Sequence, residues 1–154
     1  MASEENPIAM SVKPFSCDPH LVHGDLRSWI TEPPGMINEV AAGCMVTAQI
    51  ATDMTTKVDA AMRARWPGQK YIYIHDFSRA WGYEVETVKI LVKWGRASMR
   101  DVAAIVVVVS PRTREIDKAS VQFGQMALDL FGVPMEISED LDEIVKRFGL
   151  RPAA

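Results

Sequence analysis

The stretch Asp101-Val-Ala-Ala-Ile-Val-Val-Val-Val-Ser110 is an unbroken run of apolar, mostly β-branched residues, and it decides the fold. Pro111 follows it and ends the strand-like pattern. A strand that is hydrophobic at every position is buried on both faces, as in the middle of a parallel sheet that helices cover. The run therefore predicts an α/β domain.

Strand and helix patterns alternate on both sides of this run. Before it, residues 70–75 have the pattern of a strand and residues 83–99 that of a helix. After it, a helix over 114–131 with Thr113 as its N-cap is predicted, and Gly132 ends that helix. Pro134 places the short strand 133–137 at a sheet edge. Ser138 is expected to cap a last helix that Gly149 ends.

The amino-terminal half adds a hairpin and one more helix. Residues 27–31 and 36–42 are strand-like and are separated by the turn sequence 32–35, which contains two prolines and a glycine. A helix over 47–66 follows and stops at Pro67-Gly68. The predicted order is therefore β-β-α-β-α-β-α-β-α, a mainly parallel central sheet with an antiparallel edge hairpin and covering helices.

Composition limits the class of protein. A chain of 154 residues with 48% hydrophobic and 24% charged residues can bury one ordinary core. We expect a flexible N-terminal arm over 1–24, which is rich in proline, and one domain over 25–150. A net charge of −3 disfavours nucleic acid as a partner, and no apolar run approaches the roughly 20 residues needed to span a bilayer. Two cysteines give no disulfide framework, so a cytoplasmic location is expected.

The element order and two strand sequences carry a family resemblance. Tyr71-Ile-Tyr-Ile-His-Asp-Phe-Ser78, followed by a helix and then by Val102-Ala-Ala-Ile-Val-Val-Val-Val109, resembles the STAS domain (sulfate transporter and anti-sigma-factor antagonist). The likeness covers about residues 27–149 and extends to SEC14-like and CRAL-TRIO-like lipid-binding modules. It implies a non-enzymatic regulatory module whose partner is an anti-sigma factor, a kinase or a signalling complex.

The resemblance also implies a phosphorylation candidate. Members of the antagonist branch have a phosphorylatable serine in the loop that follows a strand of this kind. In this chain Gly82-Tyr83-Glu84 occupies the position where that branch usually has an Asp-Ser pair. Ser78 is therefore the candidate, and a phosphate there would add nearly two negative charges beside Arg79.

The loops 76–83 and 110–114 are expected on one rim, because ligands and partners meet parallel sheets at the carboxyl ends of their strands. The first loop supplies the predicted partner-binding residues, and the second adds to a candidate anion site at a helix N-terminus. The partner-binding candidates are Asp76, Ser78, Arg79, Trp81 and Tyr83, and the anion-binding candidates are Arg79, Arg112, Thr113 and Arg114.

Other chemistries are less well supported by the sequence. His75 and Asp76 are neighbours in a strand, so they point to opposite faces and cannot form a triad with Ser78. The segment Cys17 to His23 offers three metal ligands, one fewer than a structural zinc site uses. Glycine-rich phosphate loops are absent from the sequence, so we expect no cofactor.

Two functions remain open from the sequence. The first is a protein-binding regulatory module that uses loop 76–83 and the helix after it. The alternative is a carrier of a small apolar ligand or lipid, since four tryptophans and nine methionines could line a cavity. A homodimer through the edge strand or a helix face is compatible with either function.

Overall fold

The apolar run forms strand β7 (Val102–Val108) in the interior of a seven-stranded sheet. The computed structural model, which describes residues 14–154, pairs β7 in parallel with β5 (Tyr71–Asp76) and with β8 (Met135–Ser138). Alternate side chains of β7 enter two different cores, Ile105 and Val107 on one face of the sheet and Val106 and Val108 on the other. The predicted burial of this strand on both faces is confirmed.

The rest of the sheet extends from β5 to an antiparallel edge. Strand β3 (Gly35–Val40) pairs in parallel with β5, and β2 (Leu26–Glu32) forms the predicted hairpin with β3. Along the outer side of β2 lie β1 (Leu21–His23) and β9 (Arg151–Pro152), each pairing with a different half of it. The strand order is β1-β2-β3-β5-β7-β8. The mixed α/β architecture with a mainly parallel centre is therefore as predicted.

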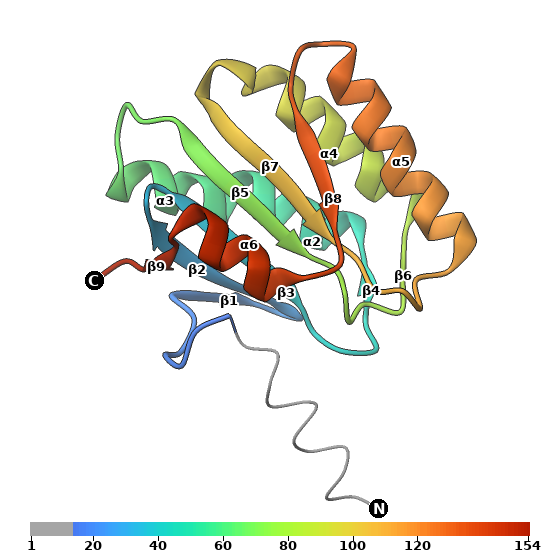
Figure 1. Cartoon of the computed structure of the whole chain (residues 1–154), viewed down its shortest axis with the longest axis horizontal. Coiled ribbons are helices and arrows are strands. Elements are labelled where there is room, and N and C mark those ends of the chain that lie inside the picture. The colour runs from blue at the N-terminus through green and yellow to red at the C-terminus, as the bar shows by residue number, and fades with distance from the viewer. Residues whose placement is uncertain (1–13) are drawn as a thin grey trace, which may run out of the picture.

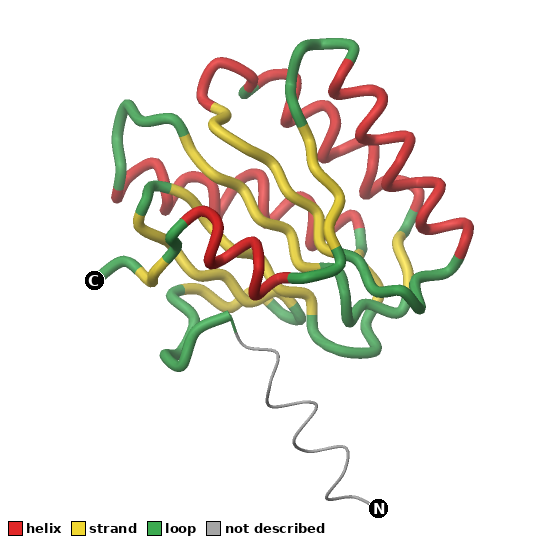
Figure 2. Tube along the Cα trace, viewed as in Figure 1, coloured by secondary structure: helices red, strands yellow, loops and turns green. Residues whose placement is uncertain are grey.

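Helices cover the two faces unequally. Figure 1 shows α6 alone in front of the sheet and the other helices behind it, with α5 outermost on that far side. Figure 2 shows the same two layers of helix around the central strands. The helical elements are α2 (Ala48–Asp53), the π-helical turn η1 (Met54–Val58), α3 (Asp59–Arg65), α4 (Val85–Ala97), the 3₁₀ turn η2 (Met99–Asp101), α5 (Glu115–Asp129) and α6 (Leu141–Phe148).

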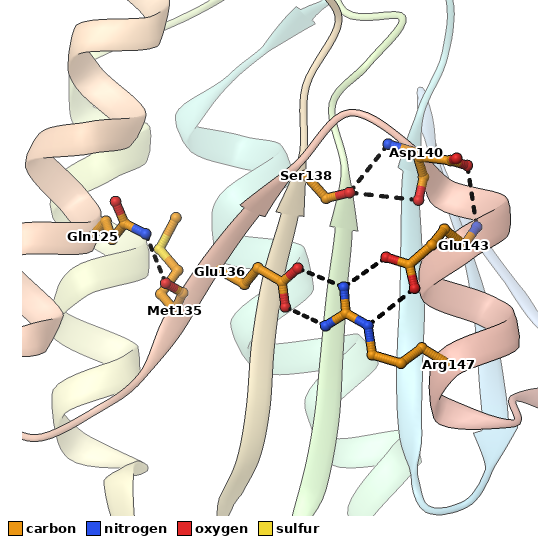
Figure 3. Close-up of polar contacts among 7 residues, drawn as sticks. All are labelled: Gln125, Met135, Glu136, Ser138, Asp140, Glu143 and Arg147. Carbon is orange, nitrogen blue, oxygen red and sulfur yellow. Dashed lines mark hydrogen bonds and ion pairs between the residues drawn. The ribbon is translucent and has the colours of Figure 1, made fainter.

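Helix α6 is tied to strand β8 by polar contacts that Figure 3 draws. The Arg147 guanidinium donates to Glu136 on β8 at 2.5 Å and to Glu143 on its own helix at 2.6 Å. The cap of α6 differs from the prediction, because the side chain of Asp140 accepts the Glu143 N–H at 3.1 Å. Ser138 instead ends β8, and its hydroxyl accepts the Asp140 N–H in the turn before the helix.

The predicted flexible arm contains ordered structure in its described part. His20 joins two segments, since its Nδ1 accepts the Ile30 N–H at 2.9 Å while its Nε2 lies 2.9 Å from the Ala153 carbonyl. The Trp29 indole donates to the Cys17 carbonyl, and Phe15 packs against the core beneath α6. Residues 14–24, which the prediction assigns to the arm, therefore include strand β1 and contacts to the domain, and residues 1–13 lie outside the described part of the chain.

Two helix predictions also need correction. The long helix predicted over 47–66 is interrupted at η1, where Thr55 and Thr56 bond their hydroxyls to carbonyls one turn back, an interaction that competes with regular helix geometry. Thr113 does not cap α5, whose N-cap position is Arg114 without a side-chain bond. The Thr113 hydroxyl accepts the Ser110 N–H at 3.0 Å and so closes the preceding turn. Among the described helices, none is long and apolar enough to cross a membrane.

Candidate functional site

The loop after β5 is held in place by its backbone. The Phe77 N–H donates to the Val108 carbonyl at 2.9 Å, and the Trp81 N–H donates to the Cys44 carbonyl at 2.8 Å. Strand β6 (Gly82–Tyr83) then pairs in parallel with β4 (Met45–Val46), which forms a second small sheet beside the large one. These bonds fix the loop at both ends, so its exposed side chains are presented from a defined backbone.

Trp81 is the most prominent side chain of this loop, with 59% of its surface exposed. The Arg114 guanidinium lies over its ring, 4.3 Å from the ring centroid. Arg114 in turn donates through Nε to Asp117 at 2.6 Å, and the other oxygen of Asp117 accepts the Tyr83 N–H at 3.1 Å. A chain of contacts from α5 therefore fixes an exposed aromatic ring on the rim.

Gly82 is required for this close approach. A Cβ added at Gly82 would lie 2.2 Å from an Arg114 guanidinium nitrogen and 3.2 Å from the Met45 sulfur. Any side chain here would displace the Arg114 guanidinium from the face of the Trp81 ring. Asp117 is almost fully buried, and its ion pair with Arg114 compensates its charge inside the rim.

Ser78 is bonded to the buried carboxyl of Asp76. The Ser78 hydroxyl donates to Asp76 Oδ1 at 2.5 Å, and its backbone N–H donates to the same oxygen at 3.1 Å. Burial raises the pKa of the Asp76 carboxyl, although the two bonds from Ser78 oppose the rise. Both residues line a shallow hollow together with Glu139, Asp140 and Asp142 at the start of α6. Ser78 therefore faces an acidic surface at the start of α6.

His75 lies on the opposite face of β5 from Asp76, as the strand geometry predicts. Its Nδ1 is 3.3 Å from the amide nitrogen of Asn38, which also bonds Met36, and its ring stacks on Phe77 at 5.9 Å. Burial lowers the pKa of His75 to about 4, so the imidazole is neutral at ordinary pH. Among the described hydrogen bonds none joins His75 to Ser78 or to Asp76, so no triad is assembled.

An apolar cavity of about 50 Å³ lies between the sheet and helices α4 and α5. A space of this size exceeds what one water needs. Its walls include the ring of Trp94, whose indole nitrogen is buried without a hydrogen-bond partner. Lining residues are His75, Phe77, Tyr83, Thr87, Val88, Leu91, Val92, Trp94, Ile105, Val107, Ser120, Val121, Gly124, Leu128 and Met135.

The predicted site residues are only partly brought together at the surface. Trp81 is exposed and Ser78 and Arg79 are half-buried, whereas Asp76 and Tyr83 are buried. Asp76 and Tyr83 therefore support the loop from the protein interior. Burial also raises the pKa of the Tyr83 phenol to about 12. A partner can reach only the other three partner-binding candidates directly.

The anion-binding candidates have other contacts. Arg114 is paired with Asp117, Thr113 accepts a backbone bond, and the Arg112 N–H donates to the Ser110 hydroxyl at 3.0 Å. Arg79 contributes its carbonyl to the Gly43 N–H at 3.0 Å. Within residues 14–154 no group of three or more His, Cys, Asp or Glu side chains is arranged to hold a metal ion.

Sequence reasoning missed the polar support of the rim and the location of the cavity. The Arg114-Glu-Ile-Asp117 spacing, an i,i+3 ion pair at a helix start, was the available signal for the support. The cavity had a weaker signal, the two glycines Gly95 and Gly124 on facing helices. Glycine in a helix interior costs stability, so paired glycines suggest close packing or free space.

Comparisons with known proteins identify the fold. No family model and no curated protein sequence matches the chain. The structure is similar to that of an uncharacterised protein of the DUF3478 family with a SpoIIAA-like fold from Shewanella loihica PV-4, with a TM-score of 0.50 and 11% sequence identity. The similarity covers 74% of this chain and 83% of that one. The SpoIIAA-like fold is the STAS-like fold, so the resemblance read from the sequence is confirmed at the level of the fold.

Proposed function

We propose that this protein is a non-enzymatic regulatory module that binds another protein through loop 76–83 and the start of α4. A SpoIIAA-like fold supports an antagonist-like binding module as the general class. The observation that carries the proposal is Trp81, an exposed indole held over Arg114 by a loop with fixed backbone bonds. Rigid exposed tryptophans beside arginines are typical anchors of protein interfaces, because little side-chain entropy is lost on binding.

The surface around Trp81 suits a partner with an apolar contact. Val85, at the first position of α4, is 75% exposed and follows the loop directly. Glu84 between them is exposed, and its side chain accepts the Ala48 N–H at 2.8 Å, which anchors this end of the loop to α2. The proposed contact surface is therefore a small apolar patch with a polar rim.

The experiment is affinity capture from native cells with three tagged forms of the full chain: wild type, Trp81→Ala and Met99→Ala. Met99 is also an exposed apolar residue, but it belongs to η2 at the far end of α4. A partner retained by wild type and Met99→Ala, and lost from Trp81→Ala, supports the proposal. Equal recovery by all three forms refutes this surface.

We further propose that phosphorylation of Ser78 regulates this binding. A phosphate on the hydroxyl would remove its donation to Asp76 and add negative charge beside Glu139, Asp140 and Asp142. Repulsion would then move the loop or the start of α6. Phosphosite mapping of the captured protein and a Ser78→Asp variant test this. If Ser78→Asp binds the captured partner as wild type does, this form of regulation is ruled out.

A second candidate function is binding of a small apolar ligand, and its site would be the cavity between the sheet and α4 and α5, which at about 50 Å³ has to enlarge to hold a ligand of ordinary size. The indole nitrogen of Trp94, which has no hydrogen-bond partner, would give an apolar ligand one polar contact, and the neutral His75 ring forms another part of the wall. Ser120→Leu would fill part of the cavity. Thr52→Leu is a matched control, because both hydroxyls bond a carbonyl one helical turn back and Thr52 faces solvent.

Native mass spectrometry of the protein as purified from its own cells measures this binding. A co-purified small molecule present with wild type and Thr52→Leu, and lost from Ser120→Leu, supports the carrier function. A wild-type mass equal to that of the bare chain counts against it.

A further inference from the structure

The hollow that Asp76 and Ser78 line at the start of α6 carries an excess of negative charge, and we call it the acidic hollow. Three exposed carboxylates form its outer side: Glu139, Asp140 and Asp142. Within the described part of the chain none of these three side chains forms an ion pair. The arginine nearby, Arg147, bonds two other glutamates (Figure 3). The negative charge of the hollow is therefore left without a cation from residues 14–154.

Part of this charge belongs to the helix itself. The free N–H groups at a helix start favour acidic residues, which accounts for Asp140 as the N-cap and for Asp142 in the first turn. Asp76 is not explained in this way, because it comes from the end of β5. It lines the hollow together with Val108, and each of these two residues is only 1% exposed, so they form its inner end. A buried strand carboxyl therefore adds to the charge of the helix start.

Only one of the two carboxyl oxygens of Asp76 is bonded. Oδ1 accepts both bonds from Ser78, whereas Oδ2 is buried and has no hydrogen-bond partner. Burial raises the pKa of this carboxyl, and the Ser78 bonds and the charge of Arg79 oppose the rise without cancelling it. A buried carboxylate that lacks a cation is costly, and a positive charge close to it relieves that cost. A cation in the acidic hollow is therefore attracted by Asp76 as well as by the outer carboxylates.

An arginine side chain has the chemistry that this hollow favours. Its guanidinium presents a planar fork of N–H donors that can bond more than one carboxylate. It is also less strongly hydrated than the ammonium group of lysine, so it enters a partly enclosed site at lower cost. We propose that the protein partner of loop 76–83 inserts an arginine into the acidic hollow, where the guanidinium bonds the outer carboxylates and compensates the charge of Asp76. This inference rests on the proposed function, since Asp76 and Ser78 begin that loop.

The test is an NMR titration of the full ¹⁵N-labelled chain with N-acetylarginine methylamide at low salt, where exposed charges are least screened. Saturable shifts are expected at the amides of 76–78 and 139–142. N-acetylcitrulline methylamide has nearly the same shape without the charge, and it should produce no saturable shift. N-acetyllysine methylamide keeps the charge without the fork, and it should bind more weakly. An arginine probe that gives no saturable shift at these amides, or that binds no better than either of the other two, overturns the proposal.

Two substitutions separate the outer carboxylates from the inner one. Asp142→Asn removes one exposed charge and is expected to raise the dissociation constant of the arginine probe about threefold. Asp76→Asn keeps the size of the side chain and an oxygen that can accept from Ser78, and we expect a rise of about tenfold. Asp129→Asn is the matched control, because Asp129 is an exposed aspartate at the end of α5, and it should bind the probe as wild type does. Circular dichroism checks that each variant is folded. Wild-type binding of the probe by both hollow variants overturns the proposal.

The captured partner separates this inference from the proposed function. Asp76→Asn and Asp142→Asn are added to the capture experiment beside Trp81→Ala. Weaker retention of the partner by both hollow variants supports the inference, and the exposed position of Asp142 excludes a loss through distortion of the loop. If Trp81→Ala loses the partner while both hollow variants retain it as wild type does, binding through the loop stands and the arginine is overturned. A partner that Trp81→Ala retains shows instead that the proposed function has failed, and the inference about that partner falls with it.

Discussion

Acidification should destabilise this protein through one buried group, His75. The imidazole is almost fully buried, and burial lowers its pKa from 6.5 to about 4. The unfolded chain therefore binds a proton at this residue between pH 6.5 and 4 while the folded chain does not. Stability is complete above pH 6.5 and falls as the pH falls through that window.

The magnitude follows from the two pKa values. Linkage with a folded pKa of about 4 and an unfolded pKa of 6.5 gives a loss of about 2 kcal/mol between pH 7.5 and pH 5. Asp76 acts in the opposite direction, because its raised pKa makes the folded chain bind a proton more readily, so acid stabilises the protein at that residue.

The assay is urea unfolding followed by tryptophan fluorescence at pH 7.5, 6.5, 5.5 and 5.0, at one protein concentration, because dimerisation would make stability depend on concentration. His75→Gln removes the titrating ring and is expected to flatten the profile over this range, whatever it does to absolute stability. His23→Gln leaves His75 in place and should keep the wild-type slope.

Two results would refute this reasoning. The first is a wild-type profile that changes by less than about 0.5 kcal/mol between pH 7.5 and 5, which would mean that water or a polar partner reaches the imidazole. The second is a slope that survives in His75→Gln. That slope would have to come from groups other than His75.

Three further predictions concern stability. Gly35→Ala should destabilise the protein by at least about 2 kcal/mol in urea unfolding, because its Cβ would lie 2.1 Å from the backbone carbonyl oxygen of Ile72. Gly124→Ala should instead stabilise it by about 0.5–1 kcal/mol by the same measurement, since the new Cβ meets only ordinary contacts of 3.6 Å or more and alanine favours the helix. Arg147→Met should leave the thermal midpoint almost unchanged despite its close bonds to two glutamates, because the network is exposed to solvent.

The centre of the fold could be read from the sequence because its signals are local. A strand such as β7, apolar at every position, has few alternatives, and the helices around it show regular apolar spacing. Strands β1, β4, β6 and β9 could not be found in this way. Each has only two or three residues, and each exists because a distant segment supplies its hydrogen bonds, as β2 does for β9.

In the candidate site, too, the sequence predicts the features that depend on local residues and misses those that depend on distant segments. Exposure of Trp81 was predictable, since a loop between Ala80 and Gly82 makes no demand for burial. Burial of Tyr83 was not, because its ring packs beside Phe77 against a core that residues of α5, distant in the sequence, help to form. The orientation of Ser78 toward acidic residues of α6 likewise depends on how the last helix crosses the sheet.

The two proposed functions share part of the molecule, and this constrains how they can operate. Phe77 and Tyr83 form walls of the apolar cavity, and both belong to the segment that presents Trp81 to a partner. A ligand that enlarged the cavity would have to displace one of these rings, and the rim loop would shift with it. Binding of a ligand and of a protein partner would then be coupled, and linkage requires the coupling to be equal in both directions. A ligand that fits the cavity without moving Phe77 or Tyr83 would leave partner binding unchanged, so the cavity would then serve only packing or carriage.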